Sequence, residues 1–377
     1  MILSRMADLQ LADPNGAWYE CYHVEDPNEV CDNCELYNTG PIAWMVIAIN
    51  YYEDKTADAN YGRMARRALD WLDTMWNTGD PNKLGSLRYC EGSDCAIPYS
   101  TSTEHNLDAY SAYYGRGILD SNDSYIEDAN LILGCLRRKL WGGSEESIVP
   151  WDVNVFWRGF DPPVEFCTDP QSWGVLALGP IGPDGEQFYK SLCWLLDPVD
   201  STRTVQDYNE SVTGVNGFRG CTGEKSYIEV DFTEHVAAAF YSIGDDANGD
   251  YFHNEMGRTV DGNEGLVHSF CDHDANVGLF LEEKGYNNYR HNYVASVAWY
   301  YFNEVTINPL RLPSAEPWAR AANIDKKGQV DFRDVSMLAS DWLESGPDLA
   351  GNIDGEGLVD FRDFGILGKY WLCGCSD

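Results

Sequence analysis

The amino-acid sequence predicts an all-α fold, in which a ring of five to six helical hairpins precedes a small C-terminal module. Three observations lead to this fold class. Apolar and amphipathic helical stretches alternate along residues 10–305, and a threonine-led helix start recurs at a nearly constant interval. Near the C-terminus, one acidic loop motif occurs twice, first at Asn323 and again 29 residues later at Asn352.

The composition limits the class of protein and of partner. The 377 residues are enough for one large domain and a small one, and 44% hydrophobic residues allow a sizeable core. The 26 basic and 61 acidic residues give a formal net charge of −35. Such a field repels nucleic acid and anionic membranes, so neither is an expected partner, and it disfavours a strongly polyanionic substrate.

The twelve cysteines favour an oxidising compartment, because their number is even and the chain is acidic and rich in aromatic residues. A zinc site is disfavoured, since the close pairs Cys31/Cys34 and Cys90/Cys95 are far apart in the sequence. We therefore expect a secreted or cell-surface protein with disulfides, although residues 1–5 do not read as a signal peptide. No run reaches the roughly 18 apolar residues that a membrane-spanning helix needs.

The helices are expected in pairs, in which an apolar inner helix is followed by an amphipathic outer one. The pairs are 41–52 with 60–76, 104–119 with 123–140, 170–178 with 187–196, and 231–241 with 251–259. Residues 289–305 form a fifth inner helix, and counting 273–284 gives a sixth hairpin. Residues 16–39, 142–166 and the glycine-rich stretch 214–223 are expected to lack helix. This alternation is typical of an α/α toroid.

Four threonine-led segments mark the expected starts of inner helices. Thr39, Thr103, Thr168 and Thr233 follow one another at intervals of 64, 65 and 65 residues. The interval places the helix N-termini on one rim of the ring, where helix dipoles and charged first turns converge.

Acidic side chains in these first turns are the candidate catalytic groups. Glu104 and Asp108 share one helical face, while Asp169 and Glu234 begin other helices. Two carboxylates can act as acid and base across a glycosidic bond, and clustering raises the pKa of at least one of them. We expect Glu104 or Glu234 as the acid and Asp108 or Asp169 as the base, with inversion if the carboxyls lie about 6.5–9.5 Å apart.

Aromatic and histidine side chains near the same turns are expected to bind sugar, because aromatic rings stack on sugar faces. The candidates are His105, Tyr110, Trp151, Asp152, Trp157, Trp173, His235 and His291.

Each of these assignments has a structural alternative. Thr101-x-x-Glu104 and Asp231-x-x-Glu234 are capping-box patterns. Asp169 precedes a proline, as an N-cap does. The histidines and tryptophans can equally be core residues.

The alternating helices and acidic rim resemble the six-hairpin glycosidase and polysaccharide-lyase superfamily over roughly residues 10–305. The resemblance is architectural, so it assigns no catalytic residue here. It implies a carbohydrate-active enzyme, most simply a glycoside hydrolase that acts on a neutral or weakly acidic polysaccharide.

Two alternatives stay open. One is a polysaccharide lyase or epimerase that uses His105, His235 or His291 with Tyr110. The other is a non-catalytic, self-assembling extracellular surface or matrix protein.

A proline-rich stretch at 308–320 marks a linker between a domain at 1–307 and a second at 321–377. The second domain contains the duplicated motif N-I-D-x-x-G-x-V-D-F-R-D, each copy leading into a helix. Oxygen ligands at loop positions 1, 3, 5, 9 and 12, with glycine at position 6, are the arrangement of a calcium loop.

The duplicated loop and helix strongly resemble the dockerin type I repeat, a small EF-hand-type module. The resemblance implies two Ca²⁺ ions and a cohesin-like partner, although such repeats can also bind their own chain or other copies of it. The implied ligands are Asn323, Asp325, the Gln329 carbonyl, Asp331 and Asp334 in loop one, and Asn352, Asp354, Glu356, the Leu358 carbonyl, Asp360 and Asp363 in loop two. Lys327 stands at position 5 of loop one, where an ammonium repels a cation, so we expect that site to be weaker or empty.

Overall fold

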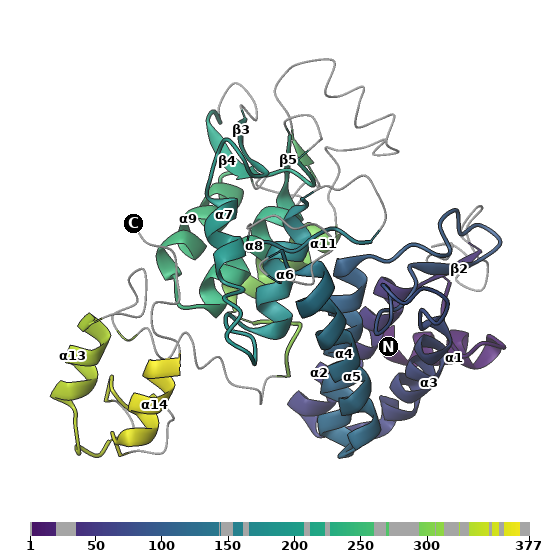
Figure 1. The fold of residues 1–377 in the computed structure, drawn as a ribbon, viewed down its shortest axis with the longest axis horizontal. Helices are drawn as coiled ribbons and strands as arrows, with labels where there is room; N and C mark the ends of the chain where they lie inside the picture. The colour runs from purple at the N-terminus through teal and green to yellow at the C-terminus, as the bar shows by residue number, and fades with distance from the viewer. Residues whose placement is uncertain are drawn as a thin grey trace. The chain divides into compact units, whose positions relative to one another are not determined.

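The computed structural model describes residues 2–19, 35–142, 144, 154–160, 166–206, 212–222, 227–259, 269–270, 294–305, 307–312, 324, 332–346, 349–353 and 358–369. These residues are mostly helical (Figure 1). The chain divides into two compact units, Met1–Val164 with Pro309–Ala315 and Glu165–Asn308 with Glu316–Asp377.

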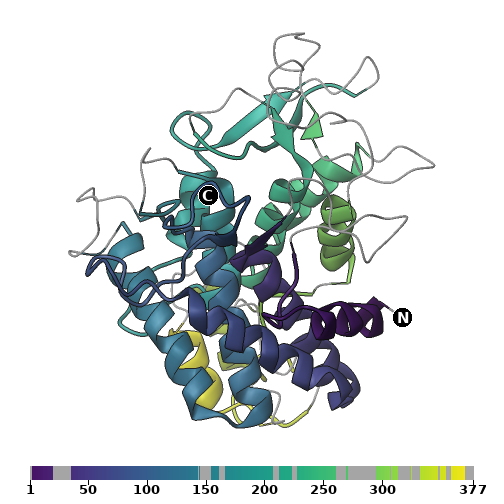
Figure 2. The same cartoon turned by 90° about the vertical axis from the view of Figure 1, so that its right-hand side faces the viewer.

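The first unit is built from helical hairpins, and its purple-to-blue helices run side by side in both views (Figure 1 and Figure 2). The inner helices α2 (Thr39–Thr56) and α4 (Thr103–Asp120) pack on each other. The outer helices α3 (Gly62–Leu72) and α5 (Asp123–Cys135) pack on α2 and α4 respectively. This is the predicted alternation of inner and outer helices.

Shorter elements complete the first unit. The sequence did not predict α1 (Ile2–Ala12). Its Gln10 Nε2 donates a hydrogen bond to the Met64 carbonyl oxygen at 2.9 Å. Strands β1 (Leu36–Asn38) and β2 (Cys90–Gly92) pair antiparallel. The turns are η1 (Ala59–Tyr61), η2 (Asp73–Met75) and the π-helical η3 (Leu136–Leu140).

The second unit repeats the hairpin arrangement. The inner helix α8 (Val230–Ser242) packs on α6 (Thr168–Leu178) and on α11 (Val294–Glu304). The outer helices α7 (Lys190–Leu195) and α9 (Asp246–Gly257) pack on α6 and α8. The predicted helix at 273–284 lies outside the described residues.

An antiparallel sheet in the second unit corrects the prediction of an all-α chain. Its strands lie in the order β3 (Arg203–Gln206), β4 (Val215–Phe218), β5 (Ile228–Glu229) and β6 (Ser269–Phe270). Figure 1 labels the first three. Strand β4 occupies the stretch expected to be a glycine-rich loop. Its Gly217 is needed for packing, because a Cβ there would lie 2.6 Å from Ile228 Cγ2. The chain is mostly helical, with a small sheet that tertiary packing stabilises.

Three threonines begin inner helices and make the same pair of hydrogen bonds. In each case the backbone N–H and the side-chain hydroxyl donate to two consecutive carbonyls of the segment that leads to the next inner helix. The pairs of accepting residues are Tyr89 and Arg88 for Thr39, Arg158 and Trp157 for Thr103, and Gly220 and Arg219 for Thr168. The bonds satisfy N–H groups that have no partner inside the helix. The interval of 64 to 65 residues therefore reports a repeated backbone anchor.

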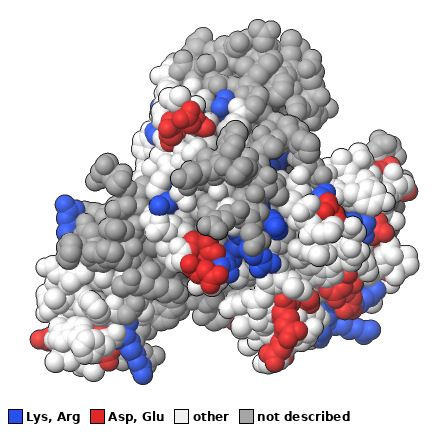
Figure 3. All heavy atoms as spheres, in the orientation of Figure 1, with Lys and Arg blue, Asp and Glu red and all other residues white. Residues whose placement is uncertain are grey.

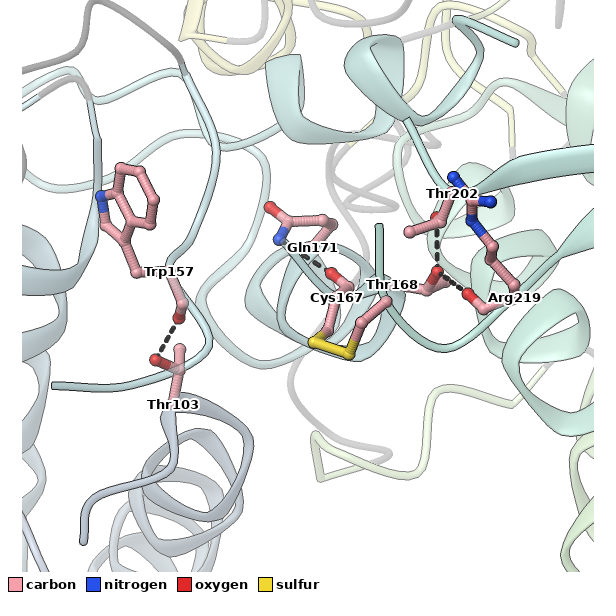
Figure 4. Close-up of a disulfide and its surroundings, with 8 residues drawn as sticks. Thr103, Trp157, Cys167, Thr168, Gln171, Thr202 and Arg219 are labelled. Carbon is pink, nitrogen blue, oxygen red and sulfur yellow. Dashed lines mark hydrogen bonds between the residues drawn. A yellow bond between two sulfur atoms is a disulfide. The ribbon is translucent and has the colours of Figure 1, made fainter. Parts of the chain in front are cut away.

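The residue before each of these threonines pairs with the same connecting segment. Asn38 pairs with Cys90, Ser102 with Gly159, and Cys167 with Cys221. In the third copy a disulfide joins Cys167 to Cys221, and Figure 4 shows this copy with the Thr168 hydroxyl bonded to Arg219 and Thr202.

The fourth threonine departs from the repeat. Helix α8 begins at Val230, so Thr233 lies inside its first turn rather than at its start. The Thr233 hydroxyl donates to the Glu229 carbonyl at 2.9 Å and accepts the Phe218 N–H at 3.1 Å. The start of α8 is thus tied to strands β4 and β5, which the helix-start pattern does not encode.

The described part of the C-terminal module is a pair of helices. Helices α13 (Phe332–Ser340) and α14 (Phe361–Lys369) pack on each other around a core of Leu338, Ile353, Val359 and Leu367. The described part of the expected linker, 308–312, is packed as well, with Leu310 and Leu312 buried.

Charged side chains of both signs lie next to each other on the described surface (Figure 3). Arg66 pairs with Asp120 at 2.9 Å, and Arg258 pairs with Glu255 at 2.7 Å. These basic side chains are paired with carboxylates and therefore do not form a positively charged patch at these two places.

Candidate active site

The first two turns of α4 hold the acidic pair that the sequence singled out. Ser102 is the N-cap, and its hydroxyl accepts the His105 N–H at 3.3 Å. Glu104 is therefore the second residue of the helix and not the partner of Thr101 in a capping box. Glu104 is half-buried, whereas Asp108, one turn further, is 1% exposed. The helix thus presents one reachable carboxylate, with a second carboxylate buried one turn behind it.

His105 packs between the two inner helices of the first unit. Its ring stacks on Tyr89 at 4.3 Å between centroids, and a Cβ on Gly40 would lie only 2.6 Å from His105 Cδ2. Burial lowers the pKa of His105 to about 4, so the ring is neutral at pH 7. These contacts are those of a residue that sets the spacing between α2 and α4.

The other sugar-binding candidates of the first unit are also largely packed. Tyr110 stacks on Tyr114 at 5.7 Å between centroids, and burial raises the pKa of Tyr110 to about 12. Trp157 is 1% exposed, and its carbonyl accepts the Thr103 hydroxyl (Figure 4). Trp151 and Asp152 lie outside the described residues.

Glu234 is enclosed by the helices around α8. It is 0% exposed, and its Oε2 accepts Asn303 Nδ2 at 2.6 Å and lies 2.8 Å from His253 Nδ1. Burial raises the pKa of Glu234, although the bonds from His253 and Asn303 oppose the rise. The far side of the histidine ring lies 3.2 Å from Glu304 Oε1. This chain of contacts ties α8 to α9 and α11, and Glu234 is the sixth residue counted from the N-cap Glu229, so it caps no helix end.

His235 lies on the neighbouring face of α8 among aromatic rings. The ring centroids of Phe232, Trp299 and Trp173 lie 5.2, 5.6 and 5.7 Å away. His235 Nδ1 lies 2.7 Å from Ser172 Oγ of α6, and Nε2 has no hydrogen-bond partner among the described residues. Burial lowers the pKa of His235 to about 3, so this imidazole is neutral and able to accept a proton only at considerable cost.

Ser172 is a partner of His235 that the sequence pattern did not predict. A usable signal existed, since the two residues are 63 positions apart, close to the interval that separates inner helices. Asp169 is half-buried in the first turn of α6, where Cys167 is the N-cap. Asp169 and Pro170 are therefore the second and third helical residues, which corrects the alternative that they form the cap and the first position. His291 lies outside the described residues.

No protein family and no curated protein matches the chain in sequence. Solved structures do match it. One is an α-amylase from Clostridium perfringens, 10% identical, which aligns over 98% of this chain and 97% of its own with a TM-score of 0.51. A cellobiose 2-epimerase from Bacillus thermoamylovorans is 11% identical over 79% of this chain and 82% of its own, with a TM-score of 0.53. A D-mannose isomerase is 9% identical over 72% and 74%, with a TM-score of 0.50.

The chain has an α/α-toroid fold. At these identities the likeness shows the fold alone, which is the architecture that the alternating helices predicted. The toroid helices carry the acidic candidates in both compact units, Glu104 and Asp108 in one and Asp169 and Glu234 in the other.

The C-terminal module places the last ligand of each expected calcium loop in the first turn of a helix. Asp334 and Asp363 are the third residues of α13 and α14 and are 0% exposed. The Asp360 N–H donates to Asp363 Oδ2 at 2.9 Å, and the Arg362 N–H donates to Asp360 Oδ1 at 2.7 Å. The Asp360 N–H therefore satisfies one oxygen of the buried Asp363 carboxylate within its own helix start.

The other loop residues are only partly described. Asn352 and Leu358 are described, whereas Asn323, Asp325, Gln329, Asp331, Asp354 and Glu356 lie outside the described residues. Within the described ranges, no group of three or more His, Cys, Asp or Glu side chains is arranged to hold a metal.

Two disulfides, Cys90–Cys95 and Cys167–Cys221, brace the described segments that precede α4 and α6. The first of them consumes two thiols that a zinc site would need, while Cys31 and Cys34 lie outside the described residues. Among the described helices, none combines the length and the apolar character that a bilayer crossing requires.

Proposed function

We propose that the chain is a carbohydrate-active enzyme, a glycoside hydrolase that acts on a neutral or weakly acidic polysaccharide. The observation that carries the proposal is Glu104, a half-buried carboxylate in the first turn of an inner helix whose capping is done by Ser102. The toroid fold and the α-amylase among the similar structures support carbohydrate chemistry. The net charge of −35 favours an uncharged chain as substrate.

In this proposal Glu104 is the general acid. Its proton passes to the glycosidic oxygen as the bond from that oxygen to the anomeric carbon breaks. A base takes a proton from the water whose oxygen bonds to the same carbon, and Asp108, one turn further along α4, is the candidate in the same compact unit. The products are two sugar chains that together contain one added water, and an inverting course requires carboxyls about 6.5–9.5 Å apart. Glu234 is the weaker candidate for the acid, because His253 and Asn303 already hold its carboxylate.

The test compares wild type with Glu104→Gln and Glu234→Gln in a reducing-end assay on soluble starch, β-1,4-glucan and mannan. Glu104→Gln is expected to lower kcat by about 10²–10⁴ with an unchanged melting temperature. Glu234→Gln is expected to lower stability instead, since it weakens the pairing with His253. Full activity of Glu104→Gln would remove this residue from the mechanism, and wild type that is inactive on every polymer would favour the matrix-protein alternative.

A second candidate function is a sugar epimerase or isomerase, and His235 is the observation that favours it. Its imidazole is neutral with Nδ1 2.7 Å from Ser172 Oγ, so it would be the group that moves the proton, although its lowered pKa makes it a weak base. Two of the similar structures are a cellobiose 2-epimerase and a D-mannose isomerase. Incubation with cellobiose, mannose or glucose in D₂O tests it, since proton abstraction would leave deuterium at carbon 2 of the product. A polysaccharide lyase is less favoured, because a uronate substrate needs basic groups that this chain has few of.

We further propose that loop two of the C-terminal module binds Ca²⁺ through Asn352, Asp354, Glu356, the Leu358 carbonyl, Asp360 and Asp363. Loop one would bind more weakly, because Lys327 occupies a ligand position. Calorimetric titration of the full chain with CaCl₂ after EDTA treatment is expected to show one tight site, which Asp363→Asn removes. Binding of a cohesin-like partner, self-association and secretion remain predictions, and the two disulfides support the oxidising compartment.

A further inference from the structure

The turn that leads into α4 exposes two large apolar side chains. Tyr99 is 76% exposed and Ile97 is 48% exposed. Single exposed apolar residues are ordinary on protein surfaces. This pair differs because the backbone beneath it is braced, which is unusual for an exposed loop tip.

The turn itself is rigid. The Ser100 N–H donates to the Ile97 carbonyl at 3.0 Å, which closes a β-turn with Pro98 at its second position. Proline fixes φ there, which favours this turn in the absence of a ligand. Lys83 Nζ donates to the Tyr99 carbonyl at 3.0 Å, which adds a second hydrogen bond to the turn.

The ends of the loop are closed as well. The Cys90–Cys95 disulfide joins its first residues, and the Tyr89 N–H donates to the Ser100 carbonyl at 2.8 Å. A tyrosine ring on such a support loses little conformational entropy when it packs against a ligand.

Tyr99 also lies near the candidate acid in the sequence. Glu104 follows it by five residues, a stretch that spans at most about 18 Å. The intervening chain is anchored, since Asn77 Nδ2 donates to Thr101 Oγ1 at 3.0 Å and Ser102 caps α4. The exposed ring and the half-buried carboxylate therefore belong to one hydrogen-bonded segment that leads into α4.

We propose that Tyr99, with Ile97 beside it, is a stacking platform for a sugar unit of the polysaccharide adjacent to the bond at which Glu104 acts. The inference rests on the proposed hydrolase function. An uncharged aromatic face suits the apolar face of a neutral pyranose, and the phenol hydroxyl offers a hydrogen bond to a sugar hydroxyl. The platform recognises the chain of the substrate rather than the scissile bond.

The test uses Tyr99→Ala, Tyr99→Trp and, as a matched control, Tyr301→Ala, since Tyr301 is 59% exposed on α11. The assays measure kcat/KM on whichever of soluble starch, β-1,4-glucan or mannan wild type cleaves best, and on the matching aryl monosaccharide glycoside. Tyr99→Ala is expected to lose about tenfold on the polymer and less than twofold on the aryl glycoside. Tyr99→Trp and Tyr301→Ala are expected to match wild type on both, and all variants are expected to keep the wild-type melting temperature.

The results separate failure of the platform from failure of the proposed function. If wild type cleaves the polymer and Tyr99→Ala matches it, the platform is overturned while the hydrolase stands. If Tyr99→Ala loses equally on both substrates, the residue affects the chemistry and the platform is again overturned. If wild type cleaves no polymer, the proposed function falls and takes the platform with it. Binding without turnover is measured by affinity electrophoresis in a gel that contains the polymer. The Glu104→Gln variant is expected to be retarded in this gel, and the Glu104→Gln, Tyr99→Ala double variant is expected to be retarded less.

Discussion

Replacing Arg116 with methionine is expected to lower the free energy of unfolding by about 3 kcal/mol. The Arg116 side chain is 1% exposed on α4, the helix that carries Glu104. Its guanidinium donates two hydrogen bonds to Glu53 and two to Asp120, at distances between 2.6 and 3.2 Å. Methionine fills much of the same volume but leaves both carboxylates without this partner.

The magnitude follows from how deeply the two acids are enclosed. Removing one member of a buried ion pair costs about 3–5 kcal/mol. The lower end applies here, because the side chains of Glu53 and Asp120 are 13% and 19% exposed. Asp120 also keeps Arg66, at 2.9 Å, so most of the loss falls on Glu53.

The same contacts predict the pH dependence. Burial raises the pKa of Asp120, but the guanidiniums of Arg116 and Arg66 outweigh burial and hold the pKa below its ordinary value. An unfolded aspartate titrates near about 3.9. Because the folded pKa is the lower one, the stabilisation is complete above that value and is lost as the pH falls through the folded pKa. Wild type should therefore lose more stability between pH 4 and pH 2 than Arg116→Met does.

Urea unfolding followed by tryptophan fluorescence, at pH 7 and at pH 3, measures both effects. The matched control is Arg66→Met, which removes a 45% exposed partner of the same aspartate and is expected to cost less than about 1 kcal/mol. Adding Glu53→Gln to Arg116→Met should recover part of the loss, since it removes the uncompensated charge. An Arg116→Met protein within about 1 kcal/mol of wild type at pH 7 would refute the assignment of this network as a clamp between α2 and α4.

Three further perturbations test other parts of the structure. Thr168→Val should cost about 1–2 kcal/mol in urea unfolding, because the Arg219 carbonyl and the Thr202 hydroxyl lose their partner, while Thr168→Ser should cost less; equal stability of Val and wild type would contradict the anchor. Burial, with Asp73 and Glu127 nearby, raises the pKa of Asp128 to about 6, so its charged form destabilises the fold at pH 7. Asp128→Asn should therefore stabilise by about 1 kcal/mol at pH 7, after allowance for its partial exposure, with no gain below pH 4; a gain that persists at pH 3 would show another cause. Replacing Cys167 and Cys221 together by serine opens a loop of 54 residues and should lower the free energy of unfolding by about 4 kcal/mol. Thermal unfolding under non-reducing conditions measures the loss. The control is the same double replacement at Cys90 and Cys95, which opens a much shorter loop and should cost less.

The helices could be predicted from the sequence because their cause is local. Residues 41–52 are apolar on every side and 60–76 on one side only. Helix α2 forms in the first stretch and buries most of it, with Pro41 and Ala48 exposed, and α3 forms in the second and buries one side. The positions of Thr39, Thr103 and Thr168 at helix starts were predictable for the same reason, since each opens a run with helical periodicity.

Partners across long sequence separations were not predictable in this way. Glu234 looked like a first-turn acid, yet its neighbours are His253 and Asn303, 19 and 69 residues away. The sheet was missed because β4 and β5 are short and gain their stability from pairing with each other and from packing on α8 and α9, not from their own composition.

By itself, the sequence determined the order of the described helical pairs, the interval between the starts of α2, α4 and α6, and the acidic first turns of α4, α6 and α8. Those properties depend on side-chain periodicity and helix-start chemistry, which act over a few residues. Only the tertiary structure decided which carboxylate is enclosed, as in Glu234, and which is half-exposed, as in Glu104. The burial of a side chain and its hydrogen-bond partners depend on which distant segments pack together. A pattern that extends over a few residues does not specify that packing.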